Sequence, residues 1–200
     1  MLAFDHIAVA AATIADGAAH VEQALGQAPG PGGRHPQMGT HNLLLGLGAR
    51  EYLEVIAVDP LASAPARPRW FDLDQREGPP RLSNWIARTD DLDAVLRRVP
   101  EAGRPLALAR GELRWRMAVP DDGVLPFGGC FPAMIEWQTP PPTMPDAGLR
   151  LERLVLRHPD AETLASVLAA LTTDPRIHVE TGEISLEARI VTPNGLRTLA

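Results

Sequence analysis

The sequence predicts an α+β fold, because one pattern of strand, helix and further strands occurs three times along the chain. Each copy opens with a short apolar run, which favours a strand, and continues after a polar break with apolar residues at helical spacing. The copies begin near residues 2, 82 and 151. Because extended segments follow each helix, the pattern excludes a plain helical bundle and favours helices on one face of an antiparallel or mixed sheet.

The first copy has clear signals at both ends of its helix. The apolar run at residues 4–10 predicts a strand. The helix is expected between Thr13, which forms an approximate capping box with Asp16, and Gly26, a common helix stop. Two more strands, joined by a connection of hairpin length, are expected at residues 40–47 and 51–58.

The second and third copies repeat this order with weaker cap signals. Thr89 is the expected N-cap after a strand at residues 84–87, and Gly103 is the expected stop. Asp160 is the expected N-cap after a strand at residues 153–156. The further strands are expected at residues 106–110, 113–119 and 131–138 in the second copy, and at residues 177–180 and 184–191 in the third.

Proline-rich segments separate the copies. Residues 60–80 connect the first copy to the second, and residues 139–145 form a stiff spacer before the third. The predicted organisation is therefore one body at residues 1–138, with modules at about 1–60 and 81–138, followed by a βαββ extension at residues 146–200.

The composition narrows the class of function. A net charge of -6 argues against nucleic acid as the partner. All 19 basic residues are arginines, so Schiff-base and other lysine chemistry is excluded. The single cysteine, Cys130, allows no intrachain disulfide and fits a reducing cytoplasm. No apolar stretch is long enough to span a bilayer, so we expect a cytoplasmic protein whose partner is a small molecule and not a membrane.

Three ionisable residues interrupt apolar strands and are the first candidates for a site: His6, Glu54 and Glu136. Burying an unpaired charge costs several kcal/mol, so each needs a partner or a wet cavity. Alternation along the first strand places His6 on one face with Phe4 and Ala8. The alternative for His6 is a core histidine satisfied by a hydrogen bond, and the alternative for the glutamates is an ion pair with an arginine.

These three residues form a reasonable ligand set for a divalent metal. One histidine and two carboxylates suit Fe, Mn, Ni, Zn or Co. Glu54 and Glu136 hold nearly equivalent places in the first and second copies, whereas the third copy has Leu154 at the histidine position and cannot repeat the site.

The chain resembles the vicinal oxygen chelate superfamily, and within it the glyoxalase-like domain proteins. Three segments carry the resemblance by their order and spacing: Phe4–Val9, Tyr52–Ile56 and Pro132–Trp137. The resemblance implies paired βαβββ modules that form a cup-shaped mixed sheet, with the C-terminal piece as a partial third module. It also implies a divalent metal in the cup, held by side chains from the first and last strands of each module.

At one implied ligand position the chain departs from the family. The ligand of the second module is expected at Trp85, or at Asn84 if the register shifts by one residue. An indole cannot ligate a metal, so Trp85 would fill the cup or stack on a substrate. The site then either keeps the three ligands His6, Glu54 and Glu136 or has lost its metal.

Further candidates for substrate contact come from the strands that line the cup in glyoxalase-like proteins. His41 and Asn42 either contact the ligand or simply begin a strand. Trp115 alternates with two arginines, so either the indole or the two guanidinium groups face the cup. His35 is expected in a loop, and the apolar loop at residues 123–129 could serve as a lid or a dimer contact.

The leading functional hypothesis is a metal-dependent lyase or isomerase that acts on a small carbonyl- or diol-containing molecule. The metal would act as a Lewis acid, and Glu54 or Glu136 would take the proton next to the carbonyl. The alternative is a metal-free binding protein in which Trp85, with Trp115 or Trp137, stacks on an apolar ligand. A third alternative is that the extension joins two chains into a homodimer.

Overall fold

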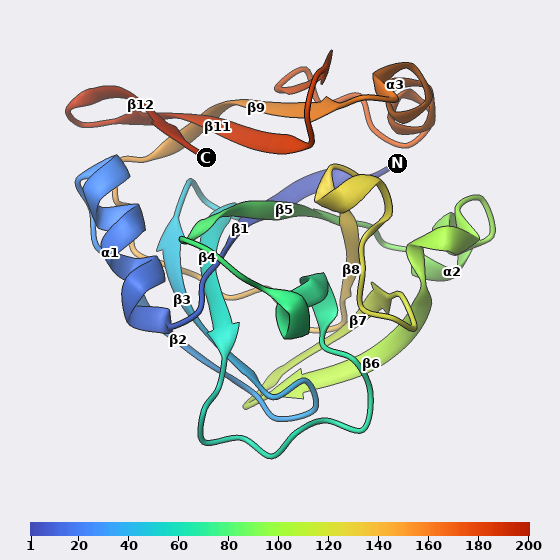
Figure 1. The fold of residues 1–200 in the computed structure, drawn as a ribbon, viewed down its shortest axis with the longest axis horizontal. Helices are drawn as coiled ribbons and strands as arrows, with labels where there is room; N and C mark the ends of the chain where they lie inside the picture. Colours follow the sequence, from blue (N-terminus) through green and yellow to red (C-terminus); the bar gives the residue numbers. More distant parts are fainter.

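The chain alternates strands and helices as predicted, and the computed structural model describes all of residues 1–200 (Figure 1). The first part contains β1 (Ala3–Ala10), α1 (Ile14–Leu25), β2 (Gly30–His35), β3 (Thr40–Gly46) and β4 (Tyr52–Val58). The second contains the 3-10 helix η1 (Trp70–Gln75), β5 (Arg81–Arg88), α2 (Leu92–Leu96), η2 (Pro100–Ala102), β6 (Arg104–Arg110), β7 (Leu113–Val119), η3 (Pro126–Gly129) and β8 (Ala133–Trp137). The third contains β9 (Arg150–His158), α3 (Ala161–Ala169), β10 (Ile177–Thr181), β11 (Ser185–Thr192) and β12 (Gly195–Leu199).

Two sheets organise these elements. The larger has the strand order β2-β3-β4-β1-β5-β8-β7-β6 and curls into a cup. At its centre β1 and β5 are antiparallel, and β4 and β8 extend them in parallel on either side. The smaller sheet, ordered β10-β9-β11-β12, lies across the outside of the cup over β1 and β5 (Figure 1). The α+β class and the paired βαβββ modules are therefore confirmed.

The helix caps agree with the sequence in the first module and differ in the second. Thr13 accepts the backbone N–H of Asp16 at 3.1 Å, and Gly26 closes α1 with φ 73°. The N-cap of α2 is Asp91 and not Thr89, because the Asp91 carboxylate accepts the N–H three residues further on at 2.8 Å. A carboxylate accepts this bond well at a helix start.

One strand of the cup has no signal in the sequence pattern. The Gly–Pro-rich stretch of β2 lacks apolar alternation, and its pairing with β3 is irregular between Pro31 and Arg34. An edge strand tolerates proline because one side of it donates no ladder hydrogen bond. As a result His35 lies at the end of a strand, where the sequence predicts a loop.

The proline-rich segment between the modules enters the cup. Figure 1 shows η1 inside the curl of the larger sheet, where Trp70, Phe71 and Leu73 are buried. Phe71 and Asp72 have φ values of 60° and 54°, which non-glycine residues rarely adopt. The protein's own side chains therefore fill much of the space that the resemblance assigns to a ligand.

Two apolar clusters pack on opposite faces of the larger sheet. The inner cluster includes Ala8, Ile86 and Trp70, whereas the outer one includes Ile7 and Trp85 and continues into the smaller sheet. The prediction that Trp85 fills the cup is therefore wrong. Its indole points outward and donates to the carbonyl of Cys130 at 2.8 Å, because it alternates with the inward-facing Asn84 and Ile86 along β5.

The C-terminal extension has one strand more than the sequence predicts. The strand β12 follows β11 in an antiparallel hairpin, and β10 pairs with β9 in parallel. This order differs from that of the two modules, in which the last strand of each pairs with the first. Arg176 also joins the extension to the cup, since it lies 2.8 Å from Glu51 and 5.2 Å above the ring of Phe4. None of the helices is long and apolar enough to cross a membrane.

We predict that Trp85→Ala destabilises the fold by about 3–5 kcal/mol, because it removes a large core side chain and leaves the Cys130 carbonyl unpaired. Urea denaturation followed by circular dichroism measures the effect. The exposed Leu61 provides a control, since Leu61→Ala should change the free energy of unfolding by less than about 0.5 kcal/mol. Equal stability of the two variants would contradict the placement of Trp85 in the core.

Candidate functional site

The inside of the cup contains a small cavity, of about 30 Å³, lined by aromatic and ionisable side chains. This volume holds about one water molecule. The lining residues come from both modules and from the segment between them: His6, His35, Asn42, Tyr52, Glu54, Trp70, Phe71, Arg110, Trp115, Met117, Ile135 and Trp137.

His6 lies at the centre of this site on β1. Its ring stacks on Tyr52 with 4.2 Å between the centroids. Its Nδ1 lies 2.7 Å from Asp5 Oδ1, and its Nε2 lies 3.6 Å from Glu54 Oε2. Burial alone lowers the pKa of His6, but the hydrogen bond to Asp5 and the nearby Glu54 carboxylate outweigh burial, so the pKa is raised. The imidazole is therefore held toward its protonated form.

A bulge in β1 lets the consecutive side chains of Asp5 and His6 lie in the same polar cluster. The pairing of β1 with β5 shifts between Phe4 and His6, so Phe4 faces outward instead of sharing the face of His6 as alternation predicts. Asp5 is fully buried, and it also accepts the indole N–H of Trp137 at 3.1 Å. These bonds orient Asp5 behind the imidazole.

Glu54 on β4 faces His6 and is ionised. Burial raises its pKa, but the charge of the nearby His6 imidazole and the hydrogen bond from Asn42 lower it, and the net pKa is about 2. Its Oε1 accepts the amide N–H of Asn42 at 2.6 Å. The site thus holds a buried carboxylate beside an imidazole that favours its charged form.

Arg110 completes the cluster from the opposite end of the sheet. It lies at the end of β6 and donates to Asn42 Oδ1 at 2.8 Å. Asn42 therefore links the Arg110 guanidinium to the Glu54 carboxylate. This contact links β6, at one edge of the curled sheet, to β3, which lies next to the other edge.

His35 provides a second, neutral imidazole. Burial lowers its pKa, the Glu54 charge opposes this, and the nearby Arg110 lowers it again, so the net pKa is about 4. Its Nε2 lies 3.3 Å from Arg110 and its Nδ1 lies 3.1 Å from Thr40 Oγ1. Since Arg110 only donates, Nε2 accepts and Nδ1 carries the proton.

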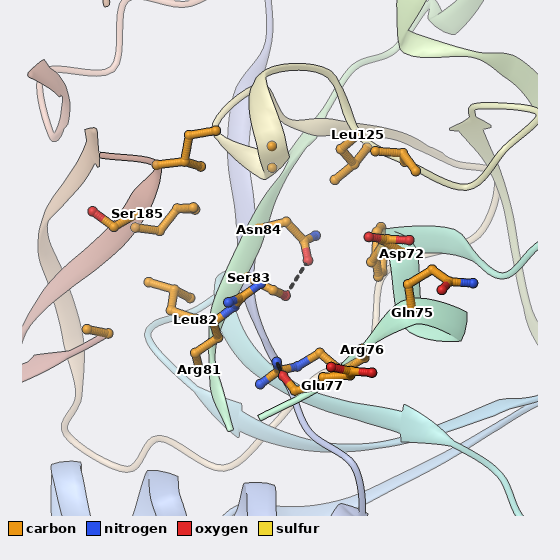
Figure 2. A pocket seen from close by; sticks show the side chains of 17 residues that line it. Asp72, Gln75, Arg76, Glu77, Arg81, Leu82, Ser83, Asn84, Leu125 and Ser185 are labelled. Atoms are coloured by element: carbon orange, nitrogen blue, oxygen red, sulfur yellow. Dashed lines mark hydrogen bonds between the residues drawn. The ribbon is translucent and has the colours of Figure 1, made fainter. Parts of the chain in front are cut away.

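The structure brings together only some of the predicted site residues. His6, Glu54, Asn42 and Trp115 line the cavity. His41 does not, because it alternates with Asn42 along β3 and faces the other side of the sheet. Asn84 faces inward but lines a separate, larger cavity further along β5 (Figure 2).

Glu136 does not join His6 and Glu54. Its carboxylate lies 3.0 Å from Arg116 and 3.4 Å from the backbone N–H of Leu92, on the face of β8 opposite the cup. The neighbours Ile135 and Trp137 occupy the inner face. The prediction that Glu136 shares a site with Glu54 is therefore wrong, because it assigned Glu136 to the wrong side of its strand.

The residues present do not fit the predicted divalent metal site. No group of three or more His, Cys, Asp or Glu side chains in residues 1–200 is arranged to hold a metal ion. In the second module the inward-facing position that corresponds to His6 is Asn84, since β1 and β5 have equal length and are followed equivalently by the N-caps Thr13 and Asp91. The matching strand pairings place Ala133 where the first module has Glu54.

Several cavity residues have no site role predicted from the sequence. Tyr52 belongs to a segment that carries the resemblance but has no role of its own, Trp70 and Arg110 belong to no motif, and His35 is expected in a loop. Arg110 sits at a hairpin, and Trp70 in a linker, so only the curl of the sheet brings them to the same cavity as His6 and Glu54. The Trp70–Phe71 pair inside a proline-rich segment was the one available signal, because two adjacent large aromatics favour burial.

Comparisons with known proteins agree with this architecture. A family model described as "Glyoxalase-like domain" matches residues 4–172, which confirms the resemblance. A hypothetical protein from Staphylococcus aureus has a similar structure, with a TM-score of 0.61 and 15% identity over 92% of this chain and 88% of that chain. Methylmalonyl-CoA epimerase from Mycobacterium tuberculosis matches with a TM-score of 0.43 and 23% identity over 67% of this chain and 85% of that chain. Comparison with the curated proteins finds no match.

We predict that the two buried histidines titrate in opposite directions from the ordinary value of 6.5. His6 should keep its proton above pH 6.5, because two carboxylates stabilise its charge, and His35 should stay neutral down to about pH 4. NMR spectra of the imidazole Cε1–H groups across pH 3.5 to 8 measure both titrations. The reverse order would contradict the electrostatics of the site.

We also predict that Glu54 makes stability depend on acidity. An unfolded glutamate takes its proton near pH 4.5 and folded Glu54 takes it near pH 2, so the unfolded state binds more protons between these values. This carboxylate should contribute about 3 kcal/mol at neutral pH, lost as the pH falls from about 5 toward 2. Urea denaturation should therefore show that Glu54→Gln lowers the free energy of unfolding more at pH 7 than at pH 3. The exposed Glu22→Gln control should lower it little at either pH. An equal cost of Glu54→Gln at both values would refute the shifted pKa.

Proposed function

This chain belongs to the glyoxalase-like domain family, and we propose that it is an isomerase-type enzyme that moves a proton on a small carbonyl- or diol-containing molecule. The observation that carries the proposal is the buried pair of Glu54 and His6 at the cavity of the cup. Perturbed ionisable groups that face a cavity are typical of acid–base sites.

The two residues suit complementary roles. His6 Nε2 and Glu54 Oε2 lie 3.6 Å apart, beyond direct hydrogen-bond distance, so the imidazole proton is free to reach a substrate oxygen. His6 would donate to the carbonyl oxygen, and Glu54 would take the proton from the adjacent carbon. The charge that develops on the oxygen is stabilised by the imidazolium. Return of the proton from Glu54 to carbon completes an isomerisation with no net gain or loss of atoms.

The pKa of Glu54 must rise for it to accept this proton. A carboxylate with a pKa of about 2 is a weak base. Once a substrate oxygen takes the His6 N–H, the charge of the imidazolium is shared with the substrate and Glu54 loses part of its stabilisation. Substrate binding itself would thus raise the basicity of Glu54.

Arg110 and Asn42 would position the substrate and the base. Asn42 holds Glu54 Oε1 at 2.6 Å, and Arg110 holds Asn42 at 2.8 Å. Arg110 is only partly buried and has further N–H groups for a hydroxyl or carboxylate of the substrate. The donor set does not fit the Zn, Ni, Mn, Fe or Co ion that the resemblance implies, so no step of this proposal uses a metal.

Substrate entry would require the η1 segment to move. Trp70 and Phe71 line the cavity, whose volume of about 30 Å³ is too small for an organic molecule. The unfavourable backbone angles of Phe71 and Asp72 make this the part of the wall that gains most by rearranging. Loops that close over a substrate and exclude water are common at such sites.

A metal-free binding protein is the second candidate. Three tryptophans line the cavity: Trp70, Trp115 and Trp137. The ring centroids of Trp115 and Trp137 lie 5.7 Å apart. Such a lining favours a flat apolar ligand held by stacking. In this case His6 and Glu54 would serve the fold and would move no proton of the ligand.

Deuterium exchange distinguishes the two functions. A panel of small 2-oxo and 2-hydroxy carbonyl compounds is incubated with the protein in D₂O, and ¹H NMR follows loss of the signal from the carbon next to the carbonyl. An isomerase-type enzyme should accelerate exchange for at least one compound, and Glu54→Gln should reduce this rate by about 100-fold or more.

Glu136→Gln is the matched control for this experiment, because Glu136 lies outside the cup and its loss should leave exchange unchanged within about twofold. Line broadening of a compound without exchange would favour the binding protein. Equal loss of exchange in both variants would overturn the role assigned to Glu54.

A further inference from the structure

A second and larger cavity, of about 590 Å³, lies where the two sheets and η1 meet (Figure 2). It exists because β8 pairs with β5 only at residues 86–88, which leaves residues 81–84 of β5 without a neighbour on that side. The η3 loop passes this gap, and the start of β11 closes it from the smaller sheet. The volume lies in the range of pockets that hold small organic molecules.

The walls of this cavity combine polar side chains with an apolar part that comes from separate parts of the fold. Leu82 belongs to β5, Leu125 precedes η3, and Leu186 belongs to β11 of the smaller sheet, just after Ile184. Phe71 of η1 lines this cavity as well as the small one in the cup. The site therefore depends on the C-terminal extension, which the two modules alone would not supply.

One buried polar group in the wall of this cavity has a donor without a partner. Asn84 is 1% exposed, and its Oδ1 accepts the hydroxyl of Ser83 at 2.7 Å. Its Nδ2 is buried and has no hydrogen-bond acceptor in the protein. Figure 2 shows the Asn84 side chain extending from β5 among the side chains that line the cavity. Buried polar groups normally have partners, so an unpaired donor in a cavity points to an acceptor supplied by a ligand.

The charged residues around the cavity favour a neutral ligand. Arg76 and Arg81 are balanced by Asp72 and Glu77. Arg76 also donates to the backbone carbonyls of Glu77 and Pro79, so its guanidinium is not free to bind an anion. No single sign of charge dominates the lining.

We propose that this cavity binds a neutral organic molecule with an apolar body and one carbonyl-type oxygen, such as an amide, an ester or a ketone. Asn84 Nδ2 donates to that oxygen, and Leu82, Leu125 and Leu186 contact the body. The site is separate from the Glu54–His6 pair and does not require proton transfer there. The cavity between the cup and the extension selects its ligand by shape and by one hydrogen bond.

Nile red is a suitable probe, because it is neutral and apolar and carries one ring carbonyl. The fluorescence emission of the dye shifts when this carbonyl accepts a hydrogen bond. Fluorescence titration of the full chain should give saturable binding. Asn84→Leu should weaken binding by about 3- to 10-fold, the worth of one neutral hydrogen bond, and should shift the emission of the bound probe to the blue.

Two further variants test the proposal even if Asn84→Leu does not fold correctly. The exposed Ser185 lines the cavity, so Ser185→Trp should fill it and weaken binding by more than about 10-fold. The exposed Thr198 on β12 lies outside the lining, and Thr198→Trp should bind as the wild type does.

Three outcomes would overturn the proposal. One is the absence of saturable binding up to about 100 µM. Another is equal affinity in the wild type, Asn84→Leu and Ser185→Trp. The third is that Glu54→Gln loses binding whereas Ser185→Trp keeps it, which would place the probe in the cup.

Discussion

The buried carboxylate of Glu54 is the constraint on which the arrangement of the cup depends. An unpaired charge at this depth would cost several kcal/mol, so the fold must supply partners from other strands. His6 of β1 and Asn42 of β3 meet the carboxylate directly, and Arg110 of β6 reaches it through Asn42. Satisfying one charge therefore connects strands at the centre of the sheet with β3 near one end and β6 at the other, and it couples the curl of the cup to the arrangement of ionisable groups inside it.

The segment between the modules adds a second constraint. In a cup of this size an apolar interior needs to be filled, and η1 fills it with Trp70 and Phe71. The cost is a pair of residues with unfavourable backbone angles. A cavity wall built from a strained connecting segment has fewer contacts to lose than a strand of the sheet, which is why we propose it as the route for a substrate.

The C-terminal extension acts mainly through the outer face of the sheet. Its leucines join Trp85 and Ile7 in one core, and Arg176 holds Glu51 while it covers Phe4. By packing there, the smaller sheet also closes the gap that β8 leaves beside β5. One packing interaction thus both stabilises the body and creates the larger cavity around Asn84.

The sequence by itself determined the class of fold, the main strands and helices, the limits of the first helix and the choice of His6 and Glu54 as ionisable residues within apolar strands, because hydrophobic periodicity and cap residues act locally. It did not determine which side of a strand a residue faces at Glu136 and Trp85, nor that the Gly–Pro-rich β2 is a strand. A bulge or a shift of one residue reverses the direction of every following side chain, and both depend on pairing with strands far away in sequence. For the same reason only the tertiary structure decided that Arg110 and Trp70 line the cavity, and that Glu136 does not join His6 and Glu54 in the predicted set of three ligands.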